Sequence, residues 1–110
     1  MATELKMPFV PPIVLEPREW EEVSAILRNH LPGRRVWAFG SRATGRRVRR
    51  FSDLDLAMEG EELTLSQAAL LREAFDESRL PFKVDIAELG SLTPEFRSRI
   101  QDDLVLVQEQ

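Results

Sequence analysis

Cysteine is absent from this 110-residue chain, and histidine occurs only once. The chain therefore has no disulfide framework, no thiolate nucleophile and no zinc site built on cysteine. The single histidine, His30, lies at the end of a predicted helix, so we interpret it as a surface or capping residue. Any metal ion would thus depend on oxygen ligands.

Long apolar runs are also missing. No stretch approaches the roughly 20 residues needed to span a bilayer. The first residues, MATELKMPFVPP, lack the basic start and the apolar core of a signal peptide. We therefore expect a cytoplasmic protein with no membrane contact. The net charge of −4 argues against general binding of nucleic acids.

Length and composition indicate one domain. With 110 residues, of which 43% are hydrophobic and 31% charged, the chain can bury one core but not two. Three prolines among the first dozen residues exclude a regular helix there. We expect residues 1–16 to form an extended lead-in and residues 17–110 to form the single folded domain.

Helical and strand patterns alternate along that domain. The helices are expected over 17–30, over 64–78 and from Thr93-Pro94 onward. The strands are expected over 35–39, 53–58 and 81–89, followed by a short apolar run over 104–107. This order predicts an α/β domain with a small sheet flanked by helices. We expect a mixed sheet, because the link between the first two strands is short for a parallel crossover.

One stretch, WAFGSRATGRRVRRFSDLDLA over residues 37–57, combines a Gly-Ser turn, five arginines and two aspartates. The arginines form a basic patch in an acidic chain, and a solvated loop explains them equally well. On a strand, Asp53 and Asp55 project from one face. The next strand adds Asp85, and adjacent strands lie about 4.8 Å apart, so the three acids could converge.

Such a group of acids has a chemical use. Unpaired carboxylates repel one another and raise at least one pKa unless a cation is bound. Magnesium accepts carboxylate and phosphate oxygens, and two such ions promote in-line phosphoryl displacement. Gly40 permits close approach of the backbone to a phosphate, and Ser41 offers a hydroxyl and an amide beside it. The arginines would add contacts to phosphates or to an anionic acceptor.

The segments GSRATG, SDLDLA and KVDIAEL together resemble the minimal nucleotidyltransferases of the polymerase-β-like superfamily, of the MNT antitoxin kind. The resemblance covers about residues 36–88 and implies the polymerase-β-like nucleotidyltransferase fold. The implied nucleotide-binding residues are Gly40, Ser41, Arg42 and Ser52. The implied catalytic and metal-binding residues are Asp53, Asp55 and Asp85, with Asp85 helping to activate the acceptor hydroxyl.

The same resemblance implies an activity and a partner. Such enzymes transfer a nucleoside monophosphate, here AMP from ATP, to a hydroxyl and release pyrophosphate. Members of this size are often encoded beside a HEPN-domain protein and can adenylylate a tyrosine of it as antitoxins. The implied ligands are two Mg²⁺ ions and an NTP, and the implied partner is a HEPN-domain protein in a hetero-oligomer.

Other interpretations remain open. An Asp-x-Asp pair also begins the site of HAD-type phosphatases, but that fold needs a longer chain and leaves Gly40-Ser41 unexplained. Asp85 also suits a strand-edge acid paired with Lys83 or with an arginine. Ser41 has no histidine or lysine base nearby in the sequence, which disfavours a nucleophilic serine. The domain could instead be an inactive module that sequesters its partner, or a small-molecule nucleotidyltransferase whose acceptor site a partner chain completes.

Overall fold

The computed structural model describes residues 11–109, so residues 1–10 of the predicted lead-in lie outside the described residues. Four strands form one sheet in the order β3-β2-β1-β4. These are β1 (Val36–Phe39), β2 (Leu54–Met58), β3 (Val84–Glu88) and β4 (Val105–Gln108). Strand β1 is antiparallel to both β2 and β4, whereas β2 and β3 are parallel. The predicted mixed sheet is confirmed.

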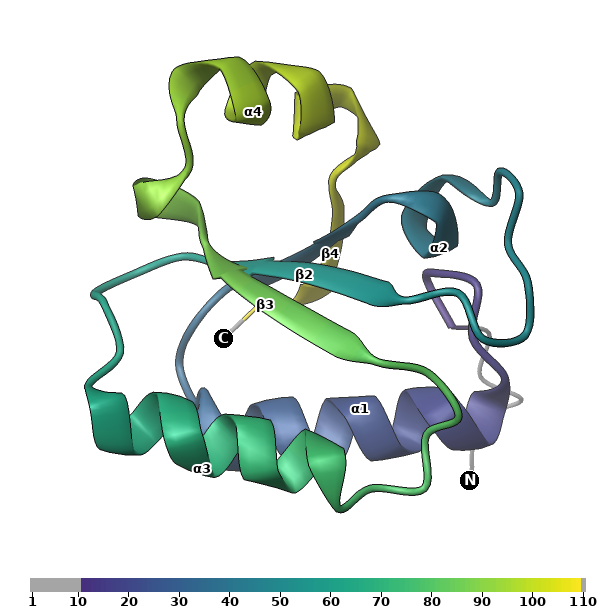
Figure 1. Cartoon of the computed structure of the whole chain (residues 1–110), viewed down its shortest axis with the longest axis horizontal. Helices are drawn as coiled ribbons and strands as arrows, with labels where there is room; N and C mark the ends of the chain where they lie inside the picture. Colours follow the sequence, from purple (N-terminus) through teal and green to yellow (C-terminus); the bar gives the residue numbers. More distant parts are fainter. Residues whose placement is uncertain (1–10, 110) are drawn as a thin grey trace, which may run out of the picture.

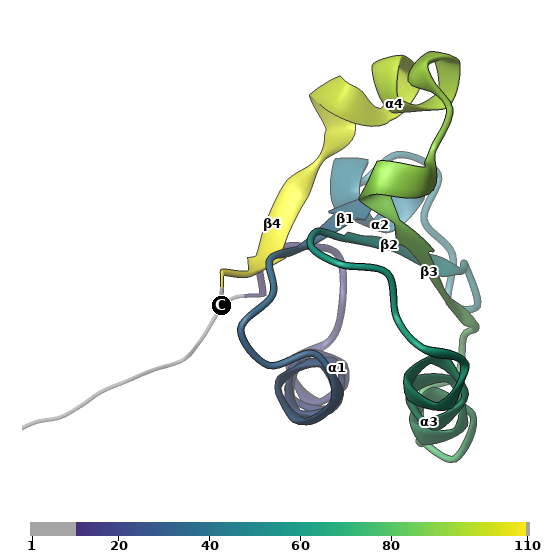
Figure 2. The same ribbon diagram turned by 90° about the vertical axis from the view of Figure 1, so that its left-hand side faces the viewer.

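Helices cover both faces of this sheet. They are α1 (Pro17–His30), α2 (Ser41–Thr44), α3 (Leu65–Asp76) and α4 (Pro94–Ile100), with 3-10 turns at η2 (Leu89–Ser91) and η3 (Gln101–Asp103). Helices α1 and α3 lie side by side on one face, and α4 lies on the other (Figure 1, Figure 2). Between residues 11 and 109, no helix has the length and hydropathy of a membrane span.

Local capping explains where the helices begin. Pro17 occupies the first turn of α1, a position that does not need its missing N–H. At α3, the Gln67 amide donates to Thr64 Oγ1 at 3.1 Å, and the Thr64 amide donates to Gln67 Oε1 at 2.9 Å. The two hydrogen bonds form a capping box. Thr93 caps α4 in the same way, by accepting from the Phe96 amide at 3.2 Å.

The hydrophobic core lies between the sheet and the pair α1 and α3. The core side chains of β2 are Leu54, Leu56 and Met58, which are almost fully buried. They pack with residues of β1 and of both helices into one cluster. Ile13 and Leu15 are buried in this cluster too, although they fall within the extended lead-in predicted over residues 1–16. Because alternate strand residues face opposite sides, Asp55 of β2 lies on the other face of the sheet.

Candidate active site

Two of the predicted acids lie side by side on the sheet. In the parallel pairing of β2 and β3, Asp55 is the register partner of Asp85. In the antiparallel pairing of β1 and β2, Asp55 is the partner of Phe39. Partners in register project from the same face, on strands about 4.8 Å apart. Asp55 and Asp85 therefore share the face turned away from α1 and α3.

The Gly-Ser turn lies directly against one of these acids. Gly40 follows β1 and precedes α2 with φ 79° and ψ −161°, a conformation that is essentially restricted to glycine. A Cβ atom on Gly40 would lie 2.7 Å from Asp55 Oδ2. The absence of a side chain thus lets the backbone of the turn approach the carboxylate. The structure brings together the two halves of the sequence motif.

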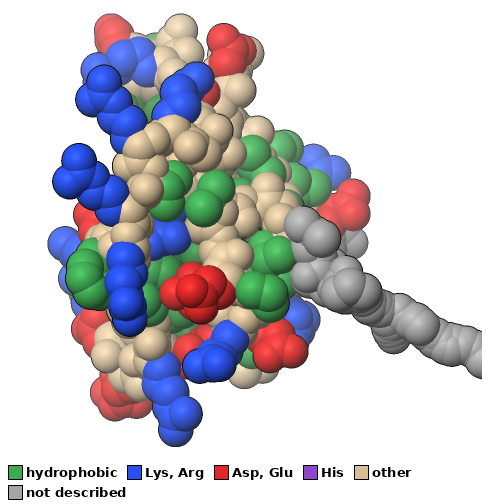
Figure 3. All heavy atoms as spheres, turned by 90° about the vertical axis from the view of Figure 1, so that its right-hand side faces the viewer, with side chains coloured by type: hydrophobic (Ala, Val, Ile, Leu, Met, Phe, Trp, Pro, Cys, Tyr) green, Lys and Arg blue, Asp and Glu red, His purple; other side chains and the backbone are tan. Residues whose placement is uncertain are grey.

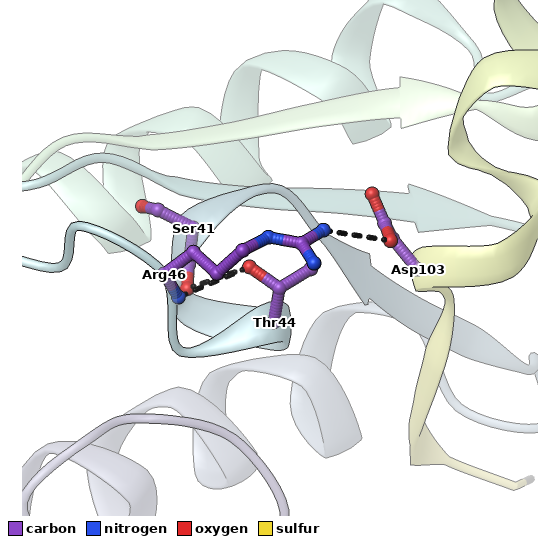
Figure 4. A network of polar contacts seen from close by, with 4 residues as sticks. All are labelled: Ser41, Thr44, Arg46 and Asp103. Carbon is purple, nitrogen blue, oxygen red and sulfur yellow. Dashed lines mark hydrogen bonds and ion pairs between the residues drawn. The ribbon is translucent and has the colours of Figure 1, made fainter.

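A short helical turn, α2, follows Gly40. Ser41 is its first residue, and the Gly45 amide closes it by donating to the Ser41 carbonyl at 2.7 Å. Thr44 Oγ1 accepts from the Arg46 amide at 3.2 Å, and Arg46 contacts Asp103 at 3.4 Å (Figure 4). The Ser41 hydroxyl points away from that contact (Figure 4). The hydroxyl is therefore not part of the network that ties the turn to η3.

The surroundings of Asp55 disfavour its charged form. Burial is the main cause that raises the pKa of this carboxyl group, followed by the negative charges of Asp85 and Asp53. A half-buried carboxylate with two acidic neighbours is destabilised when all three are ionised. A bound cation would relieve this repulsion. The electrostatics thus fit a cation or a metal-bound phosphate at this face.

Asp53 lies apart from the strand pair. It is exposed and precedes the first residue of β2. In the described part of the chain, no three acidic or histidine side chains come close enough to form a ready-made metal site. The expected convergence of three acids is therefore limited to the pair Asp55 and Asp85, with Asp53 near enough to affect the pKa of Asp55. The donors are carboxylate oxygens, the type that magnesium prefers.

Asp85 also contacts Lys83, the pairing that the sequence offered as an alternative to a site role. Its Oδ1 lies 3.8 Å from Lys83 Nζ, and about half of its side-chain surface, 52%, is exposed. An exposed ion pair of this kind contributes little to stability, typically about 0–1 kcal/mol. The Asp85 carboxylate is therefore free to exchange this partner at small energetic cost.

Two of the predicted nucleotide ligands are engaged elsewhere. Arg42 is buried, with 4% of its surface exposed, and its guanidinium donates to backbone carbonyls. Ser52 Oγ accepts from the Arg49 amide at 2.8 Å. Both side chains hold the loop between α2 and β2. Their predicted contact with the nucleotide stays a prediction, and the structure gives each a structural partner.

The remaining arginines of the stretch lie on the surface. Arg46, Arg47, Arg49 and Arg50 are exposed, as is the neighbouring Phe51 with 66% of its surface. Figure 3 views the side that carries α2 and the loop after it, and basic side chains stand out along one edge of that face. The solvated-loop interpretation therefore describes these four side chains.

An aromatic pair beside Asp55 was not foreseen from the sequence. Phe39 of β1 contacts Phe96 of α4 edge-to-face, with ring centroids 5.9 Å apart and planes at 83°. Since Phe39 is the register partner of Asp55, this pair borders the acidic face. The position of Phe39 directly before the Gly-Ser turn was the available signal. The helix that brings Phe96 to it lies 57 residues further along the chain.

The mixed sheet and the Gly-Ser turn against Asp55 are the structural counterparts of the motifs that resemble those of nucleotidyltransferases. Residues 20–107 match the family model described as "Nucleotidyltransferase domain". This match covers well over half of the sequence, and the chain belongs to that family. The nucleotidyltransferase fold expected from the resemblance is confirmed.

Individual relatives indicate which kind of nucleotidyltransferase the chain is similar to. Over 88 residues, the chain is 42% identical to "Probable protein adenylyltransferase MntA" of Haemophilus influenzae, which covers 79% of this chain and 76% of that protein. A solved structure of a candidate minimal nucleotidyltransferase is 34% identical with a TM-score of 0.60, covering 80% of this chain and 88% of the other.

Two more distant structures share the fold. One is a toxin–antitoxin crystal structure with AMP-PNP, at 22% identity and a TM-score of 0.65, covering 83% of this chain and 73% of the other. The other contains a tri-AMPylated Shewanella oneidensis HEPN toxin in complex with an MNT antitoxin. Its identity is 18%, its TM-score is 0.57, and the match covers 87% of this chain and 74% of the other.

Proposed function

We propose that this chain transfers AMP from ATP to a hydroxyl of a HEPN-domain protein and is the antitoxin of a toxin–antitoxin pair. The support is a relative at 42% identity named as a protein adenylyltransferase, and fold neighbours described as toxin–antitoxin complexes. One observation of the structure carries the proposal: the Gly40 turn lies against Asp55, which is in register with Asp85. We place the reaction in the cytoplasm, where ATP is available.

The proposed reaction is a single displacement at phosphorus. The acceptor oxygen attacks the α-phosphorus of ATP, the bond from this phosphorus to the bridging oxygen breaks, and pyrophosphate leaves. We assign Asp85 to accept the hydroxyl proton, because its side chain is half exposed and its present partner is only a surface lysine. Gly40 and Ser41 would hold the phosphates. Gly40 has no side chain to shield its backbone, and the first amides of α2, which begins at Ser41, would donate to the phosphate oxygens.

The acidic residues fit magnesium by donor type and by charge. Asp53, Asp55 and Asp85 would hold two Mg²⁺ ions, which would neutralise the triphosphate and the charge that develops on the leaving group. The pKa of Asp55 is raised first by burial and then by the charges of Asp85 and Asp53, and a bound cation would offset both effects. Binding can be tested without catalysis, by the broadening of NMR signals from these residues on addition of Mn²⁺.

The test of the proposed function is label transfer. The purified chain is incubated with α-labelled ATP, Mg²⁺ and the protein encoded by the adjacent gene, and labelled protein is measured. We expect label with the wild type and none with the Asp53→Ala, Asp55→Ala double variant. Glu73→Ala is the control, because it removes an exposed acid of α3.

A second candidate function is neutralisation by contact alone. The observation that favours it is the ion pair between Lys83 and Asp85, which engages one of the proposed catalytic acids. In that case the double variant still binds and neutralises the partner, and no NTP yields label on any protein or small-molecule acceptor. Size-exclusion chromatography of the mixture tests the hetero-oligomer that both candidates require.

A further inference from the structure

Arg42 is the one buried charged side chain in the part of the chain that the structure describes. The four other arginines of its stretch are exposed. Removing a charge from water costs several kcal/mol unless protein groups replace the water. No described carboxylate forms an ion pair with Arg42. Its burial therefore depends on other partners.

Backbone carbonyls supply these partners. Arg42 Nε donates to the Ser52 carbonyl at 2.8 Å, and Nη1 donates to the Val14 carbonyl at 2.8 Å. Nη2 donates to the Arg50 carbonyl at 3.0 Å and to the Arg49 carbonyl at 3.3 Å. The guanidinium carbon lies 4.1 Å from the ring centroid of Phe82. Charge-assisted bonds and a stacked aromatic ring thus satisfy the cation.

These contacts join the segments that carry the site. Ser52 is the residue before Asp53, so the bond from Nε fixes the start of the acidic strand β2. Phe82 is followed by Lys83, whose carbonyl accepts from the Leu54 amide at 2.9 Å where β2 and β3 begin. Arg42 itself follows Ser41 in α2, and its carbonyl accepts from the Val14 amide at 2.8 Å. The Arg42 side chain therefore contacts the backbone just before Asp53 and the Phe82 ring just before β3, from a residue that follows the Gly-Ser turn.

We propose that Arg42 is a positioning residue of the nucleotidyltransferase site and not a ligand of the nucleotide. It sets the distance of the Gly-Ser turn from the strands that carry Asp55 and Asp85. The expected effect of Arg42 on nucleotide binding rests on the proposed function. Its expected effect on the order of the backbone rests on the hydrogen bonds alone. It also explains why one arginine of the stretch is buried while the others are not.

Lysine is the informative replacement. It keeps the positive charge and the approximate length, but it has three donors on one nitrogen and cannot span four carbonyls from three directions. Its ammonium also lacks the planar surface that stacks on Phe82. Arg42→Lys therefore tests the shape and the hydrogen bonds of the guanidinium while the positive charge is kept. Arg72→Lys on the exposed side of α3 is the matched control.

The experiment measures two properties of each folded variant. Amide hydrogen exchange reports the order of residues 13–15 and 49–54, and calorimetric titration with Mg²⁺ and AMP-PNP reports the nucleotide affinity. For Arg42→Lys we expect exchange in both segments to rise at least about tenfold. We expect the affinity for AMP-PNP to fall about 10- to 100-fold, the range found when groups that orient ligands are removed. The Arg72→Lys control should match the wild type in both measurements.

Other outcomes would overturn the proposal. Weaker nucleotide binding with unchanged exchange would identify Arg42 as a direct ligand. Faster exchange with unchanged nucleotide affinity, measured below the melting temperature, would leave it a purely structural residue. If the wild type itself binds no AMP-PNP, the proposed function fails, and the exchange data still decide whether Arg42 orders these segments.

A milder variant covers the case in which Arg42→Lys does not fold. Ser52→Ala leaves the guanidinium in place and removes only the acceptor of the Arg49 amide, a 2.8 Å bond within the same loop. We expect the same direction of change in both measurements, with an effect of about threefold. No change in exchange over residues 49–54 would contradict the assignment of this loop as an ordered part of the site.

Discussion

The two faces of β2 differ in what they contribute, although their residues alternate one by one. Leu54, Leu56 and Met58 point into the core and are at most 1% exposed. Asp55 lies between the two leucines, with a pKa raised by burial and by its acidic neighbours. The core face stabilises the fold through apolar burial, whereas the acidic face reduces stability when it is fully ionised. Substitutions at adjacent positions of β2 can therefore affect the proposed reaction and the stability of the fold separately.

The largest effect is expected on the acidic face. Asp55→Asn keeps the size of the side chain but removes the charge, so we expect the rate of label transfer to fall roughly 100- to 1000-fold. The melting temperature should stay the same or rise. Initial rates with α-labelled ATP and thermal unfolding measure the two quantities. A variant with unchanged rate would show that the acidic face is not the site of transfer.

Leu56→Ala is the matching change on the core face. The side chain is fully buried, and its truncation is expected to lower the free energy of unfolding by about 2–5 kcal/mol. Urea unfolding gives this value. Below the melting temperature, transfer per folded molecule should stay near that of the wild type. A large loss of rate in fully folded protein would mean that the two faces are coupled.

Gly40→Ala tests the contact between the Gly-Ser turn and Asp55. The new Cβ atom would lie 2.7 Å from Asp55 Oδ2 in a backbone conformation that alanine rarely adopts. We expect a loss of about 1–3 kcal/mol in stability together with weaker binding of AMP-PNP. Gly33→Ala is the control, since it also has a positive φ but no atom within 4 Å of the added Cβ. Equal nucleotide affinity in the two variants would argue against a phosphate site at this turn.

The pH dependence of stability gives a further test. Because the pKa of Asp55 is raised on folding, the native state binds a proton more tightly than the unfolded chain does. The contribution of Asp55 to the free energy of unfolding is thus lost as the pH rises from the ordinary aspartate pKa, about 3.9, through the raised pKa of the folded state. We expect Asp55→Asn to gain stability over the wild type across that window and to keep the gain at pH 7. Urea unfolding between pH 3 and 7 measures it, and a gain that shrinks with rising pH would contradict the assigned cause.

The smallest effect is expected at the exposed ion pair. Lys83→Met removes the 3.8 Å contact with Asp85, and we expect the free energy of unfolding to change by less than about 1 kcal/mol. Chemical denaturation at low and at high salt measures this change. If stability falls by several kcal/mol, Asp85 is a structural acid, and its role as proton acceptor is wrong.

Much of the architecture followed from short-range patterns. The alternation of Asp and Leu over residues 53–58 predicted a strand with an acidic and an apolar face. A helix was predicted over residues 64–78, and Thr64 and Gln67 form a reciprocal capping box at its start. A special backbone conformation at Gly40 could also be expected from the sequence, because only glycine adopts its positive φ without strain. Steric and hydrogen-bonding rules within a few residues decide these features.

The sequence by itself therefore determined the helices, the strands and the pairing of a Gly-Ser turn with an Asp-x-Asp strand. Only the tertiary structure decided which acids lie side by side and which arginine is buried. The register of β2 against β3 placed Asp55 beside Asp85 and left Asp53 outside the strand. Carbonyls from segments up to 28 residues away buried Arg42, while its neighbours stayed in water. Such choices depend on contacts between distant segments, which a local pattern of residues does not contain.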